Sequence, residues 1–215
     1  MASVQALRDP MSGLTHCIAA VLAVFGTGML LGKSVSPALP WHIVTFSVFG
    51  CGMVLLYTAS TLYHWLPVSE KGVRILRRID HSMIFFYIAA TYTPICLIPL
   101  RGGWGWSLFG CAWGLAVAGI FLKVFWINAP RWFSTGVFLA MGWMALVGIY
   151  PLVMNLEAGA LAWLVLGGVL YSIGAVIYGL KRPDPLPGRF GFHEIFHLFV
   201  MAGSFCHFMV MYGYI

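Results

Sequence analysis

Residues 17–31, CIAAVLAVFGTGMLL, form an apolar run without a charged side chain. A hydrocarbon core about 30 Å thick needs roughly 20 apolar residues in a helix, and this run supplies most of them. It is longer than the apolar part of a usual signal peptide, and no clear small-x-small cleavage pattern precedes Lys33. The run therefore predicts a first transmembrane helix rather than a cleaved leader.

The whole chain has the composition of a membrane protein. Of its 215 residues, 61% are hydrophobic and 8% are charged, and the mean hydropathy is +0.91. Because about a quarter of the residues in soluble domains are charged, a water-soluble fold is excluded. At roughly 20 residues for each helix, the length accommodates about seven spans with short loops. No room remains for a soluble domain.

Breaks between the apolar runs divide the chain into expected helices. Pro183, Pro185 and Pro187, for example, predict an irregular loop because proline cannot continue a helix. We expect one all-α integral membrane domain over residues 1–215, a seven-transmembrane-helix bundle. The expected spans are residues 12–32, 42–64, 80–99, 104–126, 131–153, 159–179 and 193–213.

The lysine and arginine residues predict the orientation of the bundle. Lys33 and Arg101 lie on one side of the seven spans, and ten basic residues lie on the side of the N-terminus. These ten are Arg8, Lys71, Arg74, Arg77, Arg78, Lys123, Arg131, Lys181, Arg182 and Arg189. Because short loops rich in lysine and arginine face the cytoplasm, we expect the N-terminus cytoplasmic and the C-terminus outside. The positive charge therefore does not indicate nucleic-acid binding.

Histidines point to a candidate site. Ionisable groups in membrane spans are costly and usually mark a functional site. Five of the seven histidines are expected at the cytoplasmic ends of spans, namely His16, His64, His81, His193 and His197. His193 and His197 are four residues apart, a spacing that places both imidazoles on one helical face.

His64, His193 and His197 are the predicted metal ligands, and zinc is the expected ion. Three imidazoles with a water in the fourth position are a common catalytic zinc arrangement. Asp80 opens the expected third span, and Ser60 lies one turn before His64, so both are candidates to act beside the metal. The alternative is a set of interfacial histidines bonded to loops, which leaves their common depth unexplained.

Residues 193–197, HEIFH, also match the H-E-x-x-H helix motif of metalloproteases, in which the glutamate is the general base. Glu194 should point about 100° away from the histidine face, as it also does in such proteases, so the motif alone does not decide. The role of Glu194 stays open. His16 has two readings, a place behind a ligand or facing substrate, and an interfacial histidine. His81 is expected to face away from the site.

Several motifs together resemble a known family over almost the whole chain. They are Ser60-x3-His64, Ile79-Asp80-His81, His193-x3-His197, Asp9 to His16, Ala90-Thr-Tyr-Thr-Pro94 and Ala140-Met-Gly-Trp143. The chain is similar to the hemolysin III branch of the progestin and adipoQ receptor family. It differs in having Asp9 and Ser12 where that family usually shows glutamate and asparagine.

The resemblance implies a zinc ion held by His64, His193 and His197, with Asp80 and Ser60 as catalytic residues close to the water. It also implies ceramidase-like amide hydrolysis, and bacterial relatives are linked to hemolysis and membrane fluidity. We therefore expect a zinc-dependent hydrolase of lipid amides or esters, a multi-pass protein of the bacterial inner membrane that binds a membrane lipid. The alternatives are a membrane-perturbing hemolysin and a receptor-like sensor with a structural zinc site. No oligomeric state is predicted.

Overall fold

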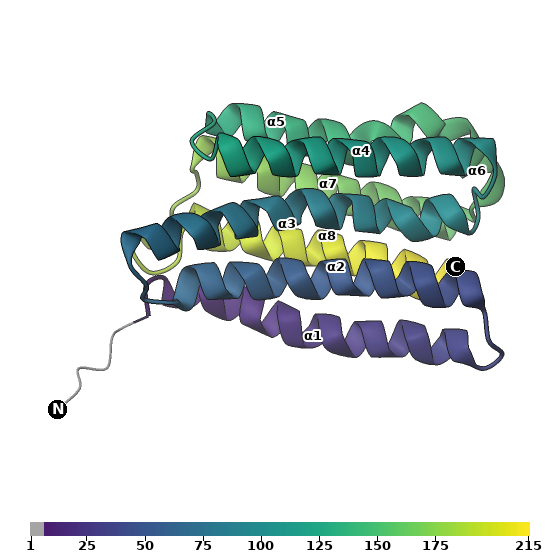
Figure 1. Cartoon of the computed structure of the whole chain (residues 1–215), viewed down its shortest axis with the longest axis horizontal. Helices are drawn as coiled ribbons and strands as arrows, with labels where there is room; N and C mark the ends of the chain where they lie inside the picture. The colour runs from purple at the N-terminus through teal and green to yellow at the C-terminus, as the bar shows by residue number, and fades with distance from the viewer. Residues whose placement is uncertain (1–6) are drawn as a thin grey trace.

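The computed structural model describes residues 7–215, and within this range the chain forms helices and no β-strand (Figure 1). The helices are α1 (Pro10–Val35), α2 (Pro40–Trp65), α3 (Glu70–Leu97), α4 (Gly103–Phe125), α5 (Arg131–Gly142), a 3-10 helix η1 (Trp143–Gly148), α6 (Ile149–Asn155), α7 (Ala158–Leu180) and α8 (Phe192–Tyr214). Because α5, η1 and α6 follow one another without a loop, they make one rod. The chain therefore runs through the bundle in the seven passes that the sequence predicts.

Six of these passes are long and apolar enough to cross a membrane. The exception is the pass made by α3, which begins at Glu70 and not near Asp80 as the sequence predicts. Its first turns carry charged residues from Glu70 to Arg78, which lower its hydropathy, so the apolar pattern does not predict these turns. The other expected spans agree with the observed helices to within about three residues at each end.

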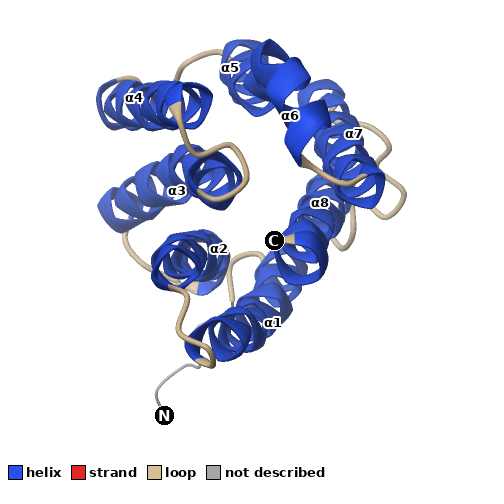
Figure 2. Cartoon of the chain, turned by 90° about the vertical axis from the view of Figure 1, so that its right-hand side faces the viewer, coloured by secondary structure: helices blue, strands red, loops and turns tan. Residues whose placement is uncertain are grey.

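The passes are arranged in a ring. Viewed end-on, successive helices follow one another around the bundle, and α8 closes the ring by lying between α7 and α1 (Figure 2). Figure 1 shows that the passes alternate in direction and that α1 begins at the opposite end of the bundle from the C-terminus. We call the end where α1 begins, α2 ends and α8 begins the histidine end, and the other end the far end.

Buried apolar side chains form two clusters inside this ring. One cluster joins α1, α2, α3, α6, α7 and α8 around residues such as Phe49 and Met211, and the second joins α3, α4 and α5 around Phe85 and Met141. Large apolar side chains also point outward, among them Phe25, which is 68% exposed. A helix that is apolar all round suits a hydrocarbon surround better than water.

The α-helical hydrogen bonding of the rod formed by α5, η1 and α6 is interrupted at η1, and the Tyr92 side chain explains why. The Tyr92 hydroxyl accepts a hydrogen bond from Ala145 N at 2.8 Å and donates toward the carbonyl oxygens of Gly142 and Met141 at 2.8 Å and 3.0 Å. A side chain inserted into the helical ladder in this way replaces main-chain bonds and tightens or bends the helix. Pro151, which lacks an N–H donor, follows in α6.

Candidate metal centre

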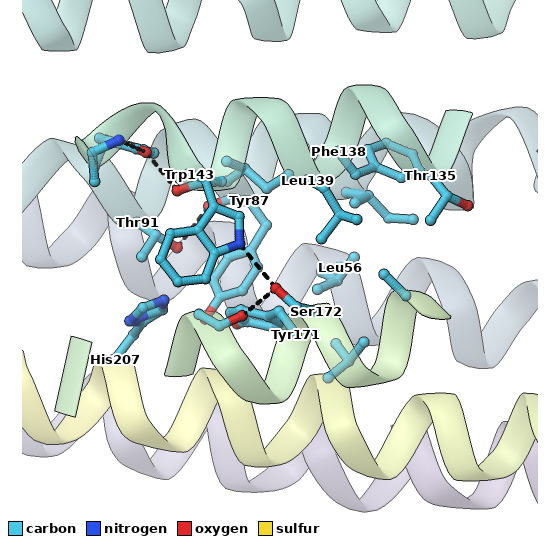
Figure 3. A pocket seen from close by; sticks show the side chains of 18 of the residues that line it. Leu56, Tyr87, Thr91, Thr135, Phe138, Leu139, Trp143, Tyr171, Ser172 and His207 are labelled. Carbon is cyan, nitrogen blue, oxygen red and sulfur yellow. Dashed lines mark hydrogen bonds between the residues drawn. The ribbon is translucent and has the colours of Figure 1, made fainter. Parts of the chain in front are cut away.

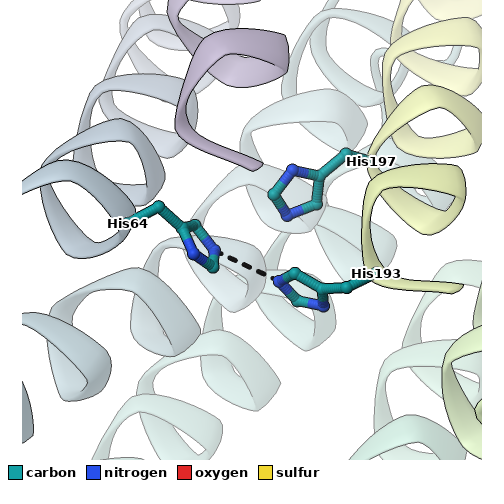
Figure 4. A group of neighbouring side chains, drawn as sticks. All are labelled: His64, His193 and His197. Carbon is teal, nitrogen blue, oxygen red and sulfur yellow. Dashed lines mark hydrogen bonds between the residues drawn. The ribbon is translucent and has the colours of Figure 1, made fainter. Parts of the chain in front are cut away.

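Three imidazoles meet at the histidine end of the bundle (Figure 4). His64 comes from the last turn of α2, and His193 and His197 come from the first turns of α8. One ring nitrogen from each histidine lies within 4.8 Å of those of the other two. The three predicted ligands are thus brought together, and together they could hold a metal ion.

The spacing and chemistry of these nitrogens fit a tetrahedral metal ion. The Nε2 atoms of His64 and His193 are 3.1 Å apart, and Zn–N bonds of about 2.0–2.1 Å in a tetrahedron place two ligand nitrogens about 3.3 Å apart. Two facing nitrogens at this separation need either a shared proton or a shared cation, because their lone pairs repel. Both arrangements are compatible with the observed contact.

The start of α1 holds two of the three rings in a defined orientation. The Nδ1 atom of His64 lies 3.1 Å from a carboxylate oxygen of Asp9, and Nδ1 of His197 lies 3.2 Å from the carbonyl oxygen of Ser12 and 3.0 Å from the Thr15 hydroxyl. Because a carbonyl oxygen only accepts hydrogen bonds, Nδ1 of His197 is the donor, and its Nε2 keeps a free lone pair. Ligand histidines in metal sites are oriented in the same manner.

His16 packs directly behind this group. Its ring stacks on that of His197 with centroids 3.6 Å apart and planes 11° from parallel. His16 is buried, and neither of its ring nitrogens has a hydrogen-bond partner among the described residues. His16 also lines an internal cavity, so the structure favours the reading of a residue behind a ligand or facing substrate over that of an interfacial histidine.

Asp80 and Ser60 lie on the inner side of the bundle near the histidines. Both are buried, the Ser60 side chain is close enough to interact with the Asp80 carboxyl, and both line an internal cavity together with His193 and His197. The prediction that Asp80 opens the third span is wrong, because α3 begins ten residues earlier, at Glu70. His81 was expected to face away, but it lines the same cavity, with its Nε2 4.0 Å from an Asp80 carboxylate oxygen.

Glu194 occupies a different position from its neighbours in the HEIFH motif. One carboxylate oxygen accepts a 2.8 Å hydrogen bond from the main-chain N–H of Gly191, and the other accepts a hydrogen bond from the Ser12 hydroxyl. The first contact caps the N-terminus of α8, and the second ties α8 to α1. Glu194 is not among the residues that line the cavity. Its contacts are therefore those of a structural residue.

The cavity has a volume of about 280 Å³ and extends from the histidine end toward the far end. Small-molecule sites usually have volumes of about 300–1,000 Å³, so the cavity is slightly smaller than that range. Most of its wall is apolar, and Leu56, Phe138 and Leu139 are among the side chains that project into it (Figure 3). A narrow apolar cavity that begins at polar groups has the shape and chemistry for an amphiphile.

The sequence does not predict the contacts of Asp9 and Thr15 with the candidate ligands His64 and His197. A signal for them exists in the spacing, since Asp9, Ser12, Thr15 and His16 share one face of a helix that begins at Pro10. The spacing shows that these residues belong together, but it does not show which histidines they would contact.

Comparison with known proteins finds relatives that match nearly the whole chain. A family model described as haemolysin-III related matches residues 4–208. The hemolysin-3 homolog of Bacillus subtilis is 37% identical over 203 residues, which cover 94% of this chain and 92% of the relative. Hemolysin-3 of Bacillus cereus is 38% identical over 206 residues, covering 95% and 90%. The human monocyte to macrophage differentiation factor is 26% identical over 209 residues, covering 94% and 82%.

These matches extend over nearly the whole chain and over most of each relative, so they include every helix that contributes to the histidine group. Six helices apolar enough to cross a bilayer, together with bacterial relatives, indicate the bacterial cell membrane as the location. The chain belongs to the haemolysin-III-related family and is a multi-pass membrane protein.

Proposed function

We propose that this protein is a zinc-dependent hydrolase that cleaves an amide or ester bond of a membrane lipid. One observation carries the proposal: polar groups suited to metal binding and proton transfer gather at one end of an apolar cavity. These groups are His193, His197, Asp80 and Ser60, with His64 completing the ligand set. The cavity would hold the acyl chain while the scissile bond lies beside the polar groups.

His64, His193 and His197 would hold the ion through their ring nitrogens. A bound zinc ion supplies Lewis-acid chemistry, which polarises a carbonyl group and makes water a nucleophile at neutral pH. A set of three nitrogen ligands suits this chemistry because it leaves a coordination position open. Asp9 and the Ser12 carbonyl oxygen would keep two of the rings in the orientation that binding needs.

Asp80 is the proposed general base. Its carboxylate accepts a proton from water as the water oxygen forms a bond to the carbonyl carbon of the lipid. The C–N or C–O bond then breaks, and the leaving atom takes the proton from Asp80. Proton transfer by a positioned side chain contributes about 10²–10⁴-fold to such a reaction. The Ser60 hydroxyl, beside Asp80, can donate a hydrogen bond that holds the carboxylate in place.

We also propose that all seven passes cross the membrane, with the N-terminus cytoplasmic and the C-terminus outside. The excess of lysine and arginine at the histidine end supports this orientation. The hydrolytic site would then face the cytoplasmic leaflet. Reporter fusions at the two termini should report opposite sides, and two fusions on the same side would contradict the topology.

The experiment combines metal analysis with a turnover assay on the purified full-length chain in lipid nanodiscs. We expect about one zinc per chain and release of fatty acid from a long-chain amide or ester, detected by mass spectrometry. Chelation should abolish both zinc and turnover, and added zinc should restore them in the wild type but not in His64→Ala. A protein without stoichiometric metal would contradict the site.

The names of two relatives, Hemolysin-3 and its homolog, supply a second candidate. According to this candidate, the protein perturbs membranes and the metal only holds the helix ends together. The metal would have the same structural role in a receptor-like sensor. Dye-loaded vesicles separate the possibilities, because a hydrolase leaves vesicles of non-substrate lipid intact. Bound zinc without turnover on any lipid amide or ester would favour this candidate over hydrolysis.

A further inference from the structure

Three basic side chains line the cavity beside the histidine group. Arg77 comes from α3, Lys123 from the end of α4, and Arg131 from the start of α5. Lys123 is 2% exposed, and its Nζ donates a 2.5 Å hydrogen bond to the Ser134 hydroxyl. Arg77 and Arg131 are partly exposed, but all three basic residues line the cavity, so three helices place positive charge around one part of it.

The cluster adjoins the proposed metal centre. The Arg131 guanidinium lies 4.6 Å from the ring centroid of Tyr178, and the Tyr178 ring lies 5.8 Å from that of His193. Arg77 is three residues before Asp80 on α3, which brings these two residues to the same face of the helix. A ligand held by the cluster would therefore have its neighbouring atoms beside Asp80 and the histidines.

These cations lack acidic partners. Among residues 7–215, no carboxylate lies within 4.0 Å of the charged nitrogens of Arg77, Lys123 or Arg131, and Asp80 is the one acidic residue that lines the cavity. Three positive charges thus face one carboxylate. Burying a charged side chain is costly unless it is paired, and this cost applies to Lys123, which is buried.

Unused hydrogen-bonding capacity surrounds the same part of the cavity. A lysine ammonium carries three N–H donors, and Ser134 accepts one from Lys123. The next residue, Thr135, also lines the cavity, and its buried hydroxyl has no partner in the described structure. An anionic oxygen cluster, such as a carboxylate or phosphate, would satisfy both the charge and these groups.

We infer that Arg77, Lys123 and Arg131 form a subsite for the anionic headgroup of an amphiphile whose acyl chain occupies the cavity. This inference rests on the proposed function and narrows its substrate class. The preferred lipid carries an acidic group next to its amide or ester bond, as in an N-acyl amino acid. A neutral amide such as a ceramide would bring no anionic group to pair with the three basic side chains.

Equilibrium binding to the full-length protein in phosphatidylcholine nanodiscs tests the inference. N-palmitoylglycine and N-palmitoylethanolamine share a chain and an amide but end in a carboxylate and a hydroxyl. We expect the wild type to bind the glycine conjugate about 10-fold more tightly, since a hydrogen bond to a charged group contributes about 1.5–3 kcal/mol. Lys123→Met should remove this preference and leave binding of the ethanolamide unchanged.

Two further variants separate the subsite from general effects of charge or packing. Lys123→Arg keeps the charge and should keep most of the preference. Lys181→Met removes an exposed lysine at the same end of the bundle and should leave both affinities unchanged. Equal affinities in the wild type would overturn the inference. A Lys123→Met protein whose affinity for the ethanolamide falls as much as its affinity for the glycine conjugate would also overturn it.

Palmitate distinguishes an acidic headgroup from the carboxylate of a fatty-acid product. If Lys123→Met weakens palmitate and leaves N-palmitoylglycine unaffected, the cluster serves the product carboxylate and the inference is wrong. Because binding is measured in chelator-treated protein, it does not depend on turnover. A charge preference without hydrolysis of either amide refutes the proposed function alone, and hydrolysis without a charge preference refutes the subsite alone.

Discussion

The two ends of the internal cavity differ in chemistry although largely the same helices build both. At the histidine end the wall carries imidazoles, a carboxylate and cations, whereas the far end is lined by Leu100, Leu108 and Leu152. Both ends are enclosed by helices that the same kind of apolar sequence produces. The difference therefore lies in a few positions that carry polar side chains. Under the proposed function, the polar end carries out the chemistry and the apolar end binds the acyl chain.

Removing the proposed general base at the histidine end should have the largest effect on activity. Asp80→Asn keeps the shape of the side chain but cannot accept a proton, so hydrolysis should fall by about 100-fold or more. Zinc content should stay close to that of the wild type, because Asp80 is not one of the three predicted ligands. Turnover and metal analysis on the same sample check both parts. An active Asp80→Asn protein would refute the assignment.

Filling the far end of the cavity with a larger side chain tests whether that end binds the acyl chain. Leu152→Trp adds a large ring to the buried far wall, and each methylene that no longer fits costs about 0.8 kcal/mol. Loss of two methylene positions should lower kcat/KM for a C16 substrate about 10-fold and leave a C8 substrate unaffected. Leu22→Trp, at a position 59% exposed on α1, is the control. Equal losses for both chain lengths would indicate misfolding instead.

Weakening the support of the ligands should have a moderate effect. Asp9→Asn removes the charge that faces Nδ1 of His64, and loss of such outer partners typically lowers metal affinity about 10–100-fold. Because an asparagine oxygen can still accept the hydrogen bond, we expect a loss near 10-fold. Competition with a chromophoric chelator measures the affinity. Glu70→Gln removes an exposed carboxylate that pairs with Arg74 and should leave zinc affinity unchanged.

The histidine group could be predicted because local rules apply to it. The helical period alone places His193 and His197 on one face, and the end of an apolar run gives the depth of His64. The Asp9 and Thr15 contacts could not be predicted, because Asp9 meets His64 across 55 positions and Thr15 meets His197 across 182. Such contacts depend on how α1 packs against α2 and α8, which the hydrophobic pattern of a single helix does not contain.

The early start of α3 and the burial of Lys123 escaped prediction for a related reason. Hydropathy identifies the apolar part of a helix and does not detect charged turns that continue it, so it predicts a loop over the first ten residues of α3. Because Lys123 lies at the end of an apolar run, the sequence predicts it among the basic residues on the side of the N-terminus. Whether such a lysine extends into water or turns inward depends on the neighbouring helices. Here the Ser134 hydroxyl on α5 accepts a hydrogen bond from Lys123 Nζ inside the bundle.

The smallest effect is expected at Glu194, and it decides between two interpretations of the HEIFH motif. If the motif acted as in metalloproteases, Glu194 would be the general base, and Glu194→Gln would lose as much activity as Asp80→Asn. Its observed partners are the Gly191 N–H and the Ser12 hydroxyl, and a glutamine amide can still accept from the former. We therefore expect turnover within about 3-fold of the wild type, because a proton-transfer role worth about 10²–10⁴ is not removed.

Stability provides the second measurement on the same variant. Charge-assisted hydrogen bonds are roughly twice as strong as neutral ones, so Glu194→Gln should lower the thermal unfolding midpoint slightly, and Glu194→Ala, which removes both acceptors, should lower it further. Activity of the folded fraction should remain in both variants. A Glu194→Gln protein that keeps its unfolding midpoint and its zinc but loses turnover would place the general base on α8 and remove Asp80 from that role.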